Sequence, residues 1–297
     1  MLAYYSDGFV LPLPAGHRFP MEKYARLRER VQAELPPGAV QLVLAPAATD
    51  REILRAHDPG WLRAVVDGTL TPAQQRDIGF PWSTAMVERS RRSAGATLAA
   101  CRSALEQGAS VNLAGGTHHA FRDRGAGYCV FNDVAIAAAA MQVERRVQRV
   151  LVVDCDVHQG DGTASIAAGD PSVFTFSIHG RNNYPFTKVA GDLDIELDDG
   201  TGDAEYLDRL AGGLDHAFAA ARAGLVIYLA GADPYEGDRL GRLSVSRAGL
   251  AARDRMVFDR CAQAGLPVAV CMAGGYAREI EDTVAIHLGT VRIAAGC

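Results

Sequence analysis

Short apolar runs alternate along the chain with longer segments in which apolar residues recur every three to four positions. The runs predict strands, and the periodic segments predict amphipathic helices. Several of the runs are almost wholly apolar, which is typical of parallel strands covered on both faces. The predicted strands are 39–45, 109–114, 149–156, 172–178, 224–230 and 267–273, and the predicted helices are 50–57, 84–107, 132–145, 204–222, 246–264 and 277–294.

This alternation predicts an α/β fold with a single open, mostly parallel sheet and helices on both faces. The chain shows no linker, repeat or low-complexity segment, so we expect one domain over residues 1–297. The segment 179–203 has weak periodicity and predicts loops with a short edge strand. No apolar stretch reaches the roughly 18 residues that would predict a membrane-spanning helix.

Composition narrows the class of protein only slightly. Apolar residues make up 48% of the chain and charged residues 22%, as in an ordinary globular protein. The formal net charge of -5 gives no reason to expect direct nucleic-acid binding or an anionic membrane. The six cysteines are scattered and form no CxxC pair. With no basic, apolar leader at the N-terminus, they predict reduced thiols and a cytoplasmic location.

Polar and glycine-rich stretches follow five of the predicted strands. They read "LAGGTHHAF", "DCDVHQGDG", "SIHGRNNYPF", "AGADPYEGD" and "MAGGYARE". In open α/β sheets the ligand crevice lies outside the carboxyl ends of the strands. The chain therefore concentrates its candidate chemistry where a ligand would bind.

The stretch "VVDCDVHQGDGTA" at residues 152–164 begins as an apolar strand but carries acids and a histidine. Because strand side chains alternate between faces, Asp154, Asp156 and His158 should project together. Asp233 follows a later strand. Two carboxylates and one imidazole form a three-ligand set with an open position, the pattern of a catalytic zinc site. We therefore predict Asp156, His158 and Asp233 as metal ligands.

Further candidates lie at neighbouring strand ends. Tandem His118 and His119 could supply a general base, and Asp154 and Asp161 are the natural carboxylates to orient them. Tyr276 in "GGY" could donate its hydroxyl to an oxyanion. Tyr128 and residues 184–186 could either wall a tube for an aliphatic chain or belong to the core. The chain contains no GxSxG elbow, no P-loop and no GxGxxG after a strand.

Taken in order, "GGTHHAF", "GYCVFND", "VDCDVHQGDGT", "FSIH", "GADPYEGDRLG" and "AGGY" resemble the histone deacetylase family of the arginase–deacetylase superfamily. The resemblance covers roughly residues 110 to 280. The "HQGDG" and "ADPYEGDRLGRL" stretches look most like the class IV branch and its bacterial relatives. The resemblance implies a zinc-dependent amidohydrolase that removes an acyl group, acetyl or longer, from the ε-amine of lysine in a protein or peptide.

The resemblance also implies roles for individual residues. Asp156, His158 and Asp233 would bind one catalytic Zn²⁺. His119 would be the general base with Asp161 as its partner, His118 paired with Asp154 would be the electrostatic partner, and Tyr276 would polarise the amide carbonyl. A structural K⁺ would lie at Asp154, Ser177 and the backbone of Ile178. Tyr128 would line the acyl-lysine tunnel, with Tyr184 or Phe186 as the opposite wall.

Three positions bear on the alternatives. Gln159 stands where most of the family has a second histidine, which we interpret as a mark of the branch. Gly160 stands where two-metal arginases have a further aspartate, which argues against a second metal. The alternative is a deacetylase of acetylpolyamine or another small acylated amine. Polyamine-selective relatives carry an acidic residue near the position of Leu240, so the neutral Leu240 favours an acyl-lysine environment. A non-catalytic module that binds acyl-lysine is a third hypothesis.

Overall fold

The computed structural model describes all residues from Met1 to Cys297. The strands are β1 (Leu2–Tyr5), β2 (Gln41–Leu44), β3 (Ala109–Asn112), β4 (Val150–Asp154), β5 (Val173–Gly180), β6 (Leu193–Leu197), β7 (Leu225–Leu229) and β8 (Val268–Cys271). The helices are α1 (Glu22–Glu34), α2 (Asp50–Ile53), α3 (Pro59–Asp67), α4 (Pro72–Ile78), α5 (Thr84–Gln107), α6 (Asp133–Val143), α7 (Asp161–Ala167), α8 (Asp203–Ala221), α9 (Arg247–Ala264) and α10 (Ile280–Ala294). No helix is long and apolar enough to cross a membrane.

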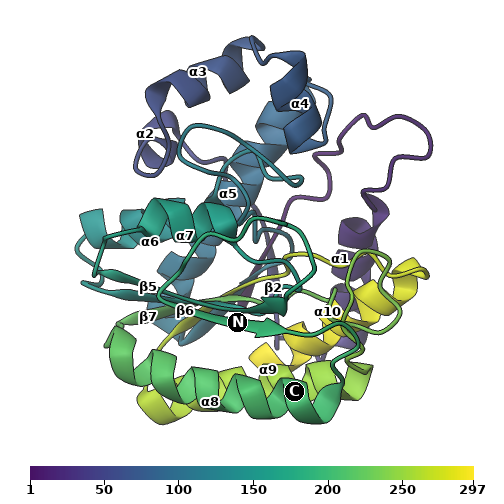
Figure 1. Ribbon diagram of the computed structural model, residues 1–297, viewed down its shortest axis with the longest axis vertical. Helices are drawn as coiled ribbons and strands as arrows, with labels where there is room; N and C mark the ends of the chain where they lie inside the picture. Colours follow the sequence, from purple (N-terminus) through teal and green to yellow (C-terminus); the bar gives the residue numbers. More distant parts are fainter.

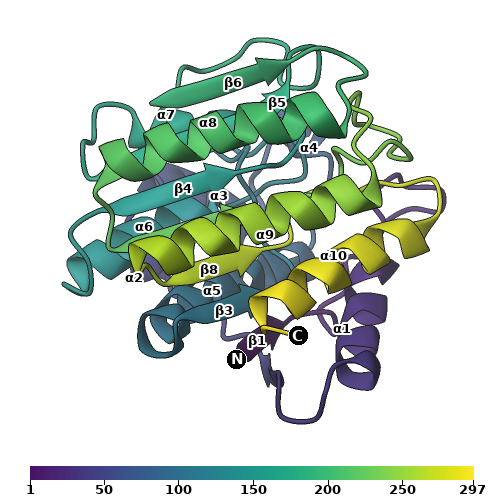
Figure 2. The same ribbon diagram turned by 90° about the horizontal axis from the view of Figure 1, so that it is seen from below.

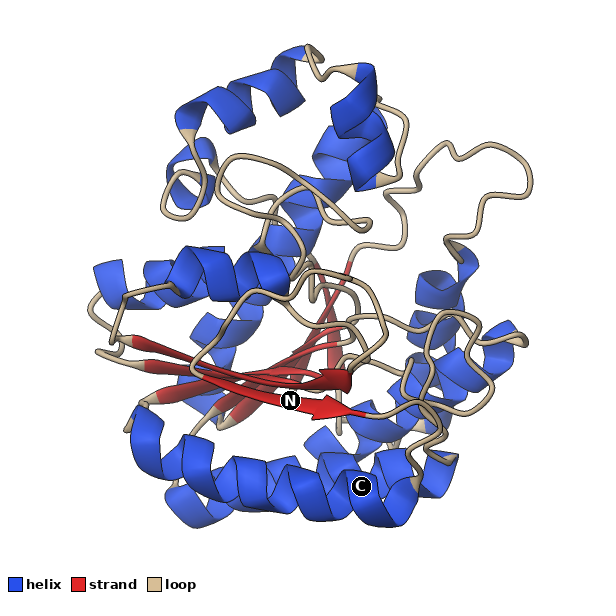
Figure 3. Ribbon diagram, in the orientation of Figure 1, coloured by secondary structure: helices blue, strands red, loops and turns tan.

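One open sheet organises the molecule. Its strand order is β2-β1-β3-β8-β7-β4-β5-β6, and every pair is parallel. The carboxyl ends of all eight strands therefore lie at the same edge, where long loops gather (Figure 3). The predicted α/β class with a mostly parallel sheet is confirmed, and the sheet is in fact wholly parallel.

Helices cover both faces of the sheet (Figure 1). Helices α8, α9 and α10 lie across one face, and Figure 2 shows them from below. Helices α5, α6 and α7 lie on the other face, with α2, α3 and α4 beyond them. Each layer encloses its own hydrophobic core, of 37 and 35 buried residues. This two-sided burial explains why the strands are apolar at nearly every position.

Strand β4 shows how the sequence pattern positions the site. Val150 and Val152 pack in the core beneath α5 and α6. Leu151, Val153 and Cys155 pack in the opposite core, against α8 and α9. The strand ends at Asp154, so the polar residues that follow leave the sheet at its carboxyl edge.

All six predicted strands are present, and the edge strand expected within 179–203 is β6. Strand β1 was not predicted, because four residues are too few to show a period and their partners are remote in sequence. The predicted helix 50–57 is too long, since α2 ends at Ile53. Asp58 then takes an extended conformation before Pro59, as residues before proline tend to do.

Candidate metal centre

The three predicted metal ligands lie together at the carboxyl edge of β4 and β7. Candidate ligand atoms of Asp156, His158 and Asp233 lie within 4.8 Å of one another, and all three residues are buried. Asp156 Oδ1 is 2.9 Å from His158 Nδ1. Main-chain donors fix both carboxylates: the Val157 N–H lies 2.9 Å from Asp233 Oδ1, and the Gly274 N–H lies 2.7 Å from Asp156 Oδ2.

A metal ion fits this triad. Asp233 Oδ2 is buried and accepts no hydrogen bond, although it lies 3.4 Å from His158 Nδ1. Burial and the charge of Asp156 raise the pKa of Asp233 to about 7. Burial would lower the pKa of His158, but the two carboxylates raise it to about 10. The triad therefore favours a positive charge, and its two oxygen donors and one nitrogen donor suit a zinc-type ion.

The glycine after β8 keeps this space open. A Cβ atom at Gly274 would collide with the carboxylates of both Asp156 and Asp233. The same residue donates its N–H to Asp156. Glycine at this position therefore lets the backbone approach the triad closely enough to hold it.

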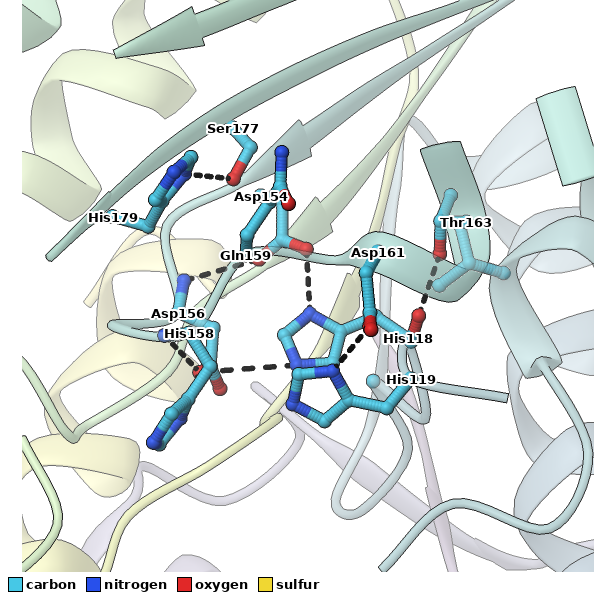
Figure 4. Close-up of polar contacts among 12 residues, drawn as sticks. His118, His119, Asp154, Asp156, His158, Gln159, Asp161, Thr163, Ser177 and His179 are labelled. Carbon is cyan, nitrogen blue, oxygen red and sulfur yellow. Dashed lines mark hydrogen bonds and ion pairs between the residues drawn. The ribbon is translucent and has the colours of Figure 1, made fainter. Parts of the chain in front are cut away.

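Two histidine–carboxylate pairs stand beside the triad (Figure 4). His118 Nδ1 lies 2.7 Å from Asp154 Oδ2, and His119 Nδ1 lies 2.6 Å from Asp161 Oδ1. Because an ionised carboxylate can only accept, each Nδ1 carries the proton in its pair. We call Asp156, His158 and Asp233, together with these two pairs, the site floor.

The two histidines differ in charge. Burial would lower the pKa of His118, but the carboxylates of Asp154 and Asp156 raise it to about 9. Burial and the charge on His118 lower the pKa of His119 to about 4, despite its bond to Asp161. These shifts favour the cationic form of His118 and the neutral form of His119, whose Nε2 is then available as an acceptor.

A hydrogen-bond network that the sequence analysis did not assign holds the loop that carries His118 and His119, which we call the histidine loop. Asp133 accepts hydrogen bonds from the N–H groups of Gly116 (2.9 Å) and Thr117 (2.7 Å). The Asn132 amide donates to the carbonyl of Ala120 (3.0 Å) and to the Thr163 hydroxyl (3.0 Å). Asn132 and Asp133 close the "GYCVFND" stretch, and their place beside a strand-end motif was the available signal.

Tyr276 lies in the loop after β8 and is buried. Burial raises the pKa of its hydroxyl well above the usual value, so the phenol stays protonated and can donate. Asp238 accepts the Tyr276 N–H at 2.6 Å. Lys23 from α1, also buried, donates to the carbonyl of Gly275 at 3.2 Å and lies 5.2 Å from the centre of the Tyr276 ring. The sequence analysis assigned Lys23 no role, because α1 is remote from the other motifs.

A cavity of about 440 Å³ opens above the site floor, and His118, His119, Asp156, His158 and Tyr276 all contribute to its lining. The four predicted tunnel residues, Tyr128, Tyr184, Phe186 and Leu240, also line it. They belong to three separate loops, and Tyr128 also packs against the hydrophobic core that contains Trp61 and Phe80.

These wall residues are held in different ways. The Tyr128 backbone adopts a positive φ of 67°, which is rare for a bulky residue, and its N–H is held by the Ile78 carbonyl at 2.7 Å. The Tyr184 ring lies edge-on to His119, with 4.9 Å between ring centres. Phe186 is 82% exposed and stands at the mouth of the cavity. We call residues 181–192, which join β5 to β6 and carry Tyr184 and Phe186, the rim loop.

The residues of the predicted K⁺ site come together on adjacent strands. Asp154 of β4 pairs in register with Ser177 of β5, and Ile178 follows directly. Asp154 Oδ1 accepts the Asp156 N–H at 3.1 Å, and the Ser177 hydroxyl lies 2.8 Å from His179 Nδ1. Asp154 thus connects this region to the site floor.

A buried Asp–His–Asp triad beside two histidine–carboxylate pairs defines a metal-dependent hydrolase centre. The histone deacetylase domain family matches residues 17–291, and the chain belongs to this family. It is 45% identical over 286 residues to an uncharacterized protein of Picosynechococcus sp., covering 95% of this chain and 94% of that protein. It is 30% identical over 284 residues to a histone deacetylase-like amidohydrolase of Pseudomonas aeruginosa, covering 89% and 74%.

A plant relative and two solved structures extend this picture. The chain is 34% identical to histone deacetylase 2 of Arabidopsis thaliana over 201 residues, 65% of this chain and 52% of that protein, so it spans about half the plant protein's length. An HDAC homologue crystallised with SAHA superposes with a TM-score of 0.85 at 22% identity, covering 99% of this chain and 83% of that one. The HDA15 HD domain gives 0.84 at 22% identity, covering 100% and 91%.

Both structures share the α/β fold of this chain. Together with the family match and the Asp156, His158 and Asp233 triad, these findings identify the protein as a histone deacetylase-like amidohydrolase with a metal-binding site.

Proposed function

We propose that the protein is a zinc-dependent deacylase that removes an acyl group, acetyl or longer, from the ε-amine of lysine in a protein or peptide. One observation carries this proposal: two buried histidine–carboxylate pairs lie beside a buried Asp–His–Asp triad, at the base of a cavity walled by aromatic rings. A zinc ion held by Asp156, His158 and Asp233 supplies Lewis acidity toward the amide carbonyl and toward water.

The protein's own residues then perform the proton chemistry. His119 Nε2 accepts a proton from the attacking water, while the bond from Nδ1 to Asp161 holds the ring in the correct tautomer. His118, kept cationic by Asp154, stabilises the negative charge that develops and can help protonate the departing amine. The Tyr276 hydroxyl, protonated because it is buried, donates to the oxyanion.

The finer assignments belong to the same proposal. We propose that K⁺ lies beside Asp154, Ser177 and the Ile178 carbonyl, which would supply the oxygen ligands that such an ion takes.

Placement in the class IV branch is supported by Gln159 and by the "ADPYEGDRLGRL" stretch. One continuous sheet supports a single catalytic domain over the 297 residues. A cytoplasmic location is consistent with six free cysteines, five of them buried.

The cavity favours an acyl-lysine over an acetylpolyamine. Leu240 lines the wall where an acidic residue would attract a polyamine cation, and its side chain is neutral. Tyr128 and Tyr184 provide flat aromatic surfaces suited to the methylene chain of lysine. The length of the acyl group is left to experiment.

The test is acid release by zinc-loaded protein from peptides bearing acetyl- to myristoyl-lysine, with acetylspermidine as a competing substrate and Asp156→Ala as the control. We expect release from peptides by the wild type and a loss of about 10³-fold or more in the variant, because the metal contributes several kcal/mol to catalysis. Faster turnover of acetylspermidine would favour the polyamine alternative. Peptide binding without acid release would favour a non-catalytic module.

A further inference from the structure

Gln159 directly follows the predicted metal ligand His158, and its side chain points away from the reacting groups. Figure 4 shows its amide directed away from the two histidine–carboxylate pairs. The residue is 1% exposed, so its amide must find partners inside the protein. Those partners lie in the rim loop and at the start of β6.

The Gln159 amide pairs with both backbone groups of one residue. Its Oε1 accepts the Val189 N–H at 2.9 Å, and its Nε2 donates to the Val189 carbonyl at 2.7 Å. Nε2 also donates to Asp194 Oδ1 at 2.9 Å. Asp194 Oδ2 accepts the Gly191 N–H at 2.7 Å, which fixes the turn into β6. The second half of the rim loop is thus attached to the residue that follows a metal ligand.

The first half of the rim loop has a separate attachment. The Asn183 amide donates to the Leu240 carbonyl at 2.7 Å and accepts the Arg242 N–H at 3.2 Å. Lys188 donates to the carbonyls of Asn183 (2.7 Å) and Pro185 (2.6 Å), which closes the loop on itself. The loop segment that carries the Tyr184 ring, beside His119, therefore lies between two anchors.

We propose that Gln159 is a positioning residue that sets the substrate-facing wall of the cavity by fixing Val189, and so determines how tightly the acyl-amine substrate is held. This proposal rests on the proposed function. Glutamine suits the task because its C=O and N–H₂ lie side by side and match the N–H and C=O of one backbone residue. The two nitrogens of an imidazole point in divergent directions and cannot make this pair, which gives the departure from a second histidine a physical role.

The anchor itself is testable without turnover. In Gln159→Ala and Gln159→His we expect the Val189 amide to exchange with solvent about tenfold faster or more. The reason is that the loop can open locally without first breaking the hydrogen bonds between Gln159 and Val189. Trypsin should cut after Lys188 faster by a similar factor. The histidine variant supplies the readout if the alanine variant folds poorly. Gln142→Ala is the matched control, since Gln142 donates to Ser172 at the opposite edge of the sheet.

Two hydroxamate probes of different length then distinguish an effect at the cavity wall from an effect at the metal site. Acetohydroxamate reaches only the site floor, whereas a hydroxamate with a long aliphatic chain and an aryl cap reaches the rim loop. We expect the Gln159 variants to weaken the long probe about tenfold, equivalent to about 1.4 kcal/mol, and to leave acetohydroxamate and zinc affinity unchanged. With peptide substrates KM should rise by a similar factor, and kcat should stay close to that of the wild type.

The outcomes are distinct. Unchanged exchange at Val189, or faster exchange with no change for the long probe, would overturn the positioning role. Equal weakening of both probes would overturn it as well, since the effect would then lie at the metal. A wild type that hydrolyses no acylated amine, combined with the expected difference between probes, would refute the proposed function and leave the positioning role supported.

Discussion

The site floor and the rim loop are held in place by different kinds of interaction. Each carboxylate and imidazole of the floor is buried near the carboxyl edge of the sheet, and backbone donors or a paired side chain fix its orientation. The rim loop has no strand or helix of its own between β5 and β6. It is held by side-chain hydrogen bonds, among them those of Gln159, Asn183 and Asp192.

This difference divides the expected effects of substitution. Changing a floor residue leaves a buried group without its partner, which costs more free energy than losing an exposed contact. Changing a rim residue alters how a substrate is held but leaves the reacting groups in place. Floor variants should therefore change kcat or folding stability, and rim variants should change KM.

Tyr276→Phe, in the loop after β8 that lines the same cavity, is expected to have the largest effect after Asp156→Ala. Removing the hydroxyl deletes one donor to the developing oxyanion, so we expect turnover to fall by about 10²–10³-fold. The ring still packs against Lys23 and Tyr128, so folding and zinc content should not change. Steady-state kinetics on the best peptide, with zinc measured on the same sample, checks this. Wild-type turnover in a zinc-loaded variant would remove Tyr276 from the catalytic assignment.

The floor could be predicted from sequence because it follows local rules. Parallel strands bring their carboxyl ends to one edge, although strand alternation does not reach Asp156 and His158, because β4 ends at Asp154. Asp156, His158 and Asp233 therefore had to lie close together once six strands were recognised. The tandem histidines followed a strand end for the same reason.

The supporting residues could not be predicted this way. Lys23 contacts the Tyr276 loop from a helix some 250 positions earlier, and no local pattern encodes such a contact. Arg253 is fully buried in α9 and donates to the Gly231 carbonyl at 2.5 Å, behind the triad, yet it occupies an ordinary position in a helical segment. The anchor role of Gln159 depends on where a loop of irregular backbone passes, and only the folded structure defines that.

A pH-dependent stability is expected from His57, which lies outside the site floor and contacts Asn132, a residue that supports the loop carrying His118 and His119. Its Nε2 accepts the Asn132 N–H at 2.8 Å, and Nδ1 lies 3.3 Å from the Arg122 carbonyl. A proton on Nε2 would face the Asn132 N–H, so the folded protein disfavours the charged ring. Burial lowers the pKa of His57 to about 4. The Asn132 side chain, in turn, holds the histidine loop.

The direction in which stability changes with pH follows from the pKa of His57 in the unfolded and folded states. The unfolded chain binds the proton near pH 6.5 and the folded chain near pH 4, so the stabilisation is complete above pH 6.5 and is lost as the pH falls toward 4. The loss amounts to about 3 kcal/mol at most. Denaturant unfolding from pH 4 to 7 should show a shallower pH slope in His57→Gln than in the wild type. The exposed His216→Gln is the control, and equal slopes in His57→Gln and the wild type would refute the interpretation.

The smallest expected effect lies at the rim, where Phe186 is 82% exposed. An exposed aromatic ring at the edge of a binding site contributes little to affinity because water still reaches it. Phe186→Ala should therefore raise KM for acylated peptides by about two- to threefold, equivalent to less than about 1 kcal/mol, and leave kcat unchanged. Val143→Ala, another exposed apolar residue but outside the cavity, is the matched control. A fall in kcat for Phe186→Ala would mean that the rim takes part in the chemistry, and the separation between rim and floor would then fail. An unchanged KM would instead confine substrate recognition to Tyr128, Tyr184 and the deeper wall.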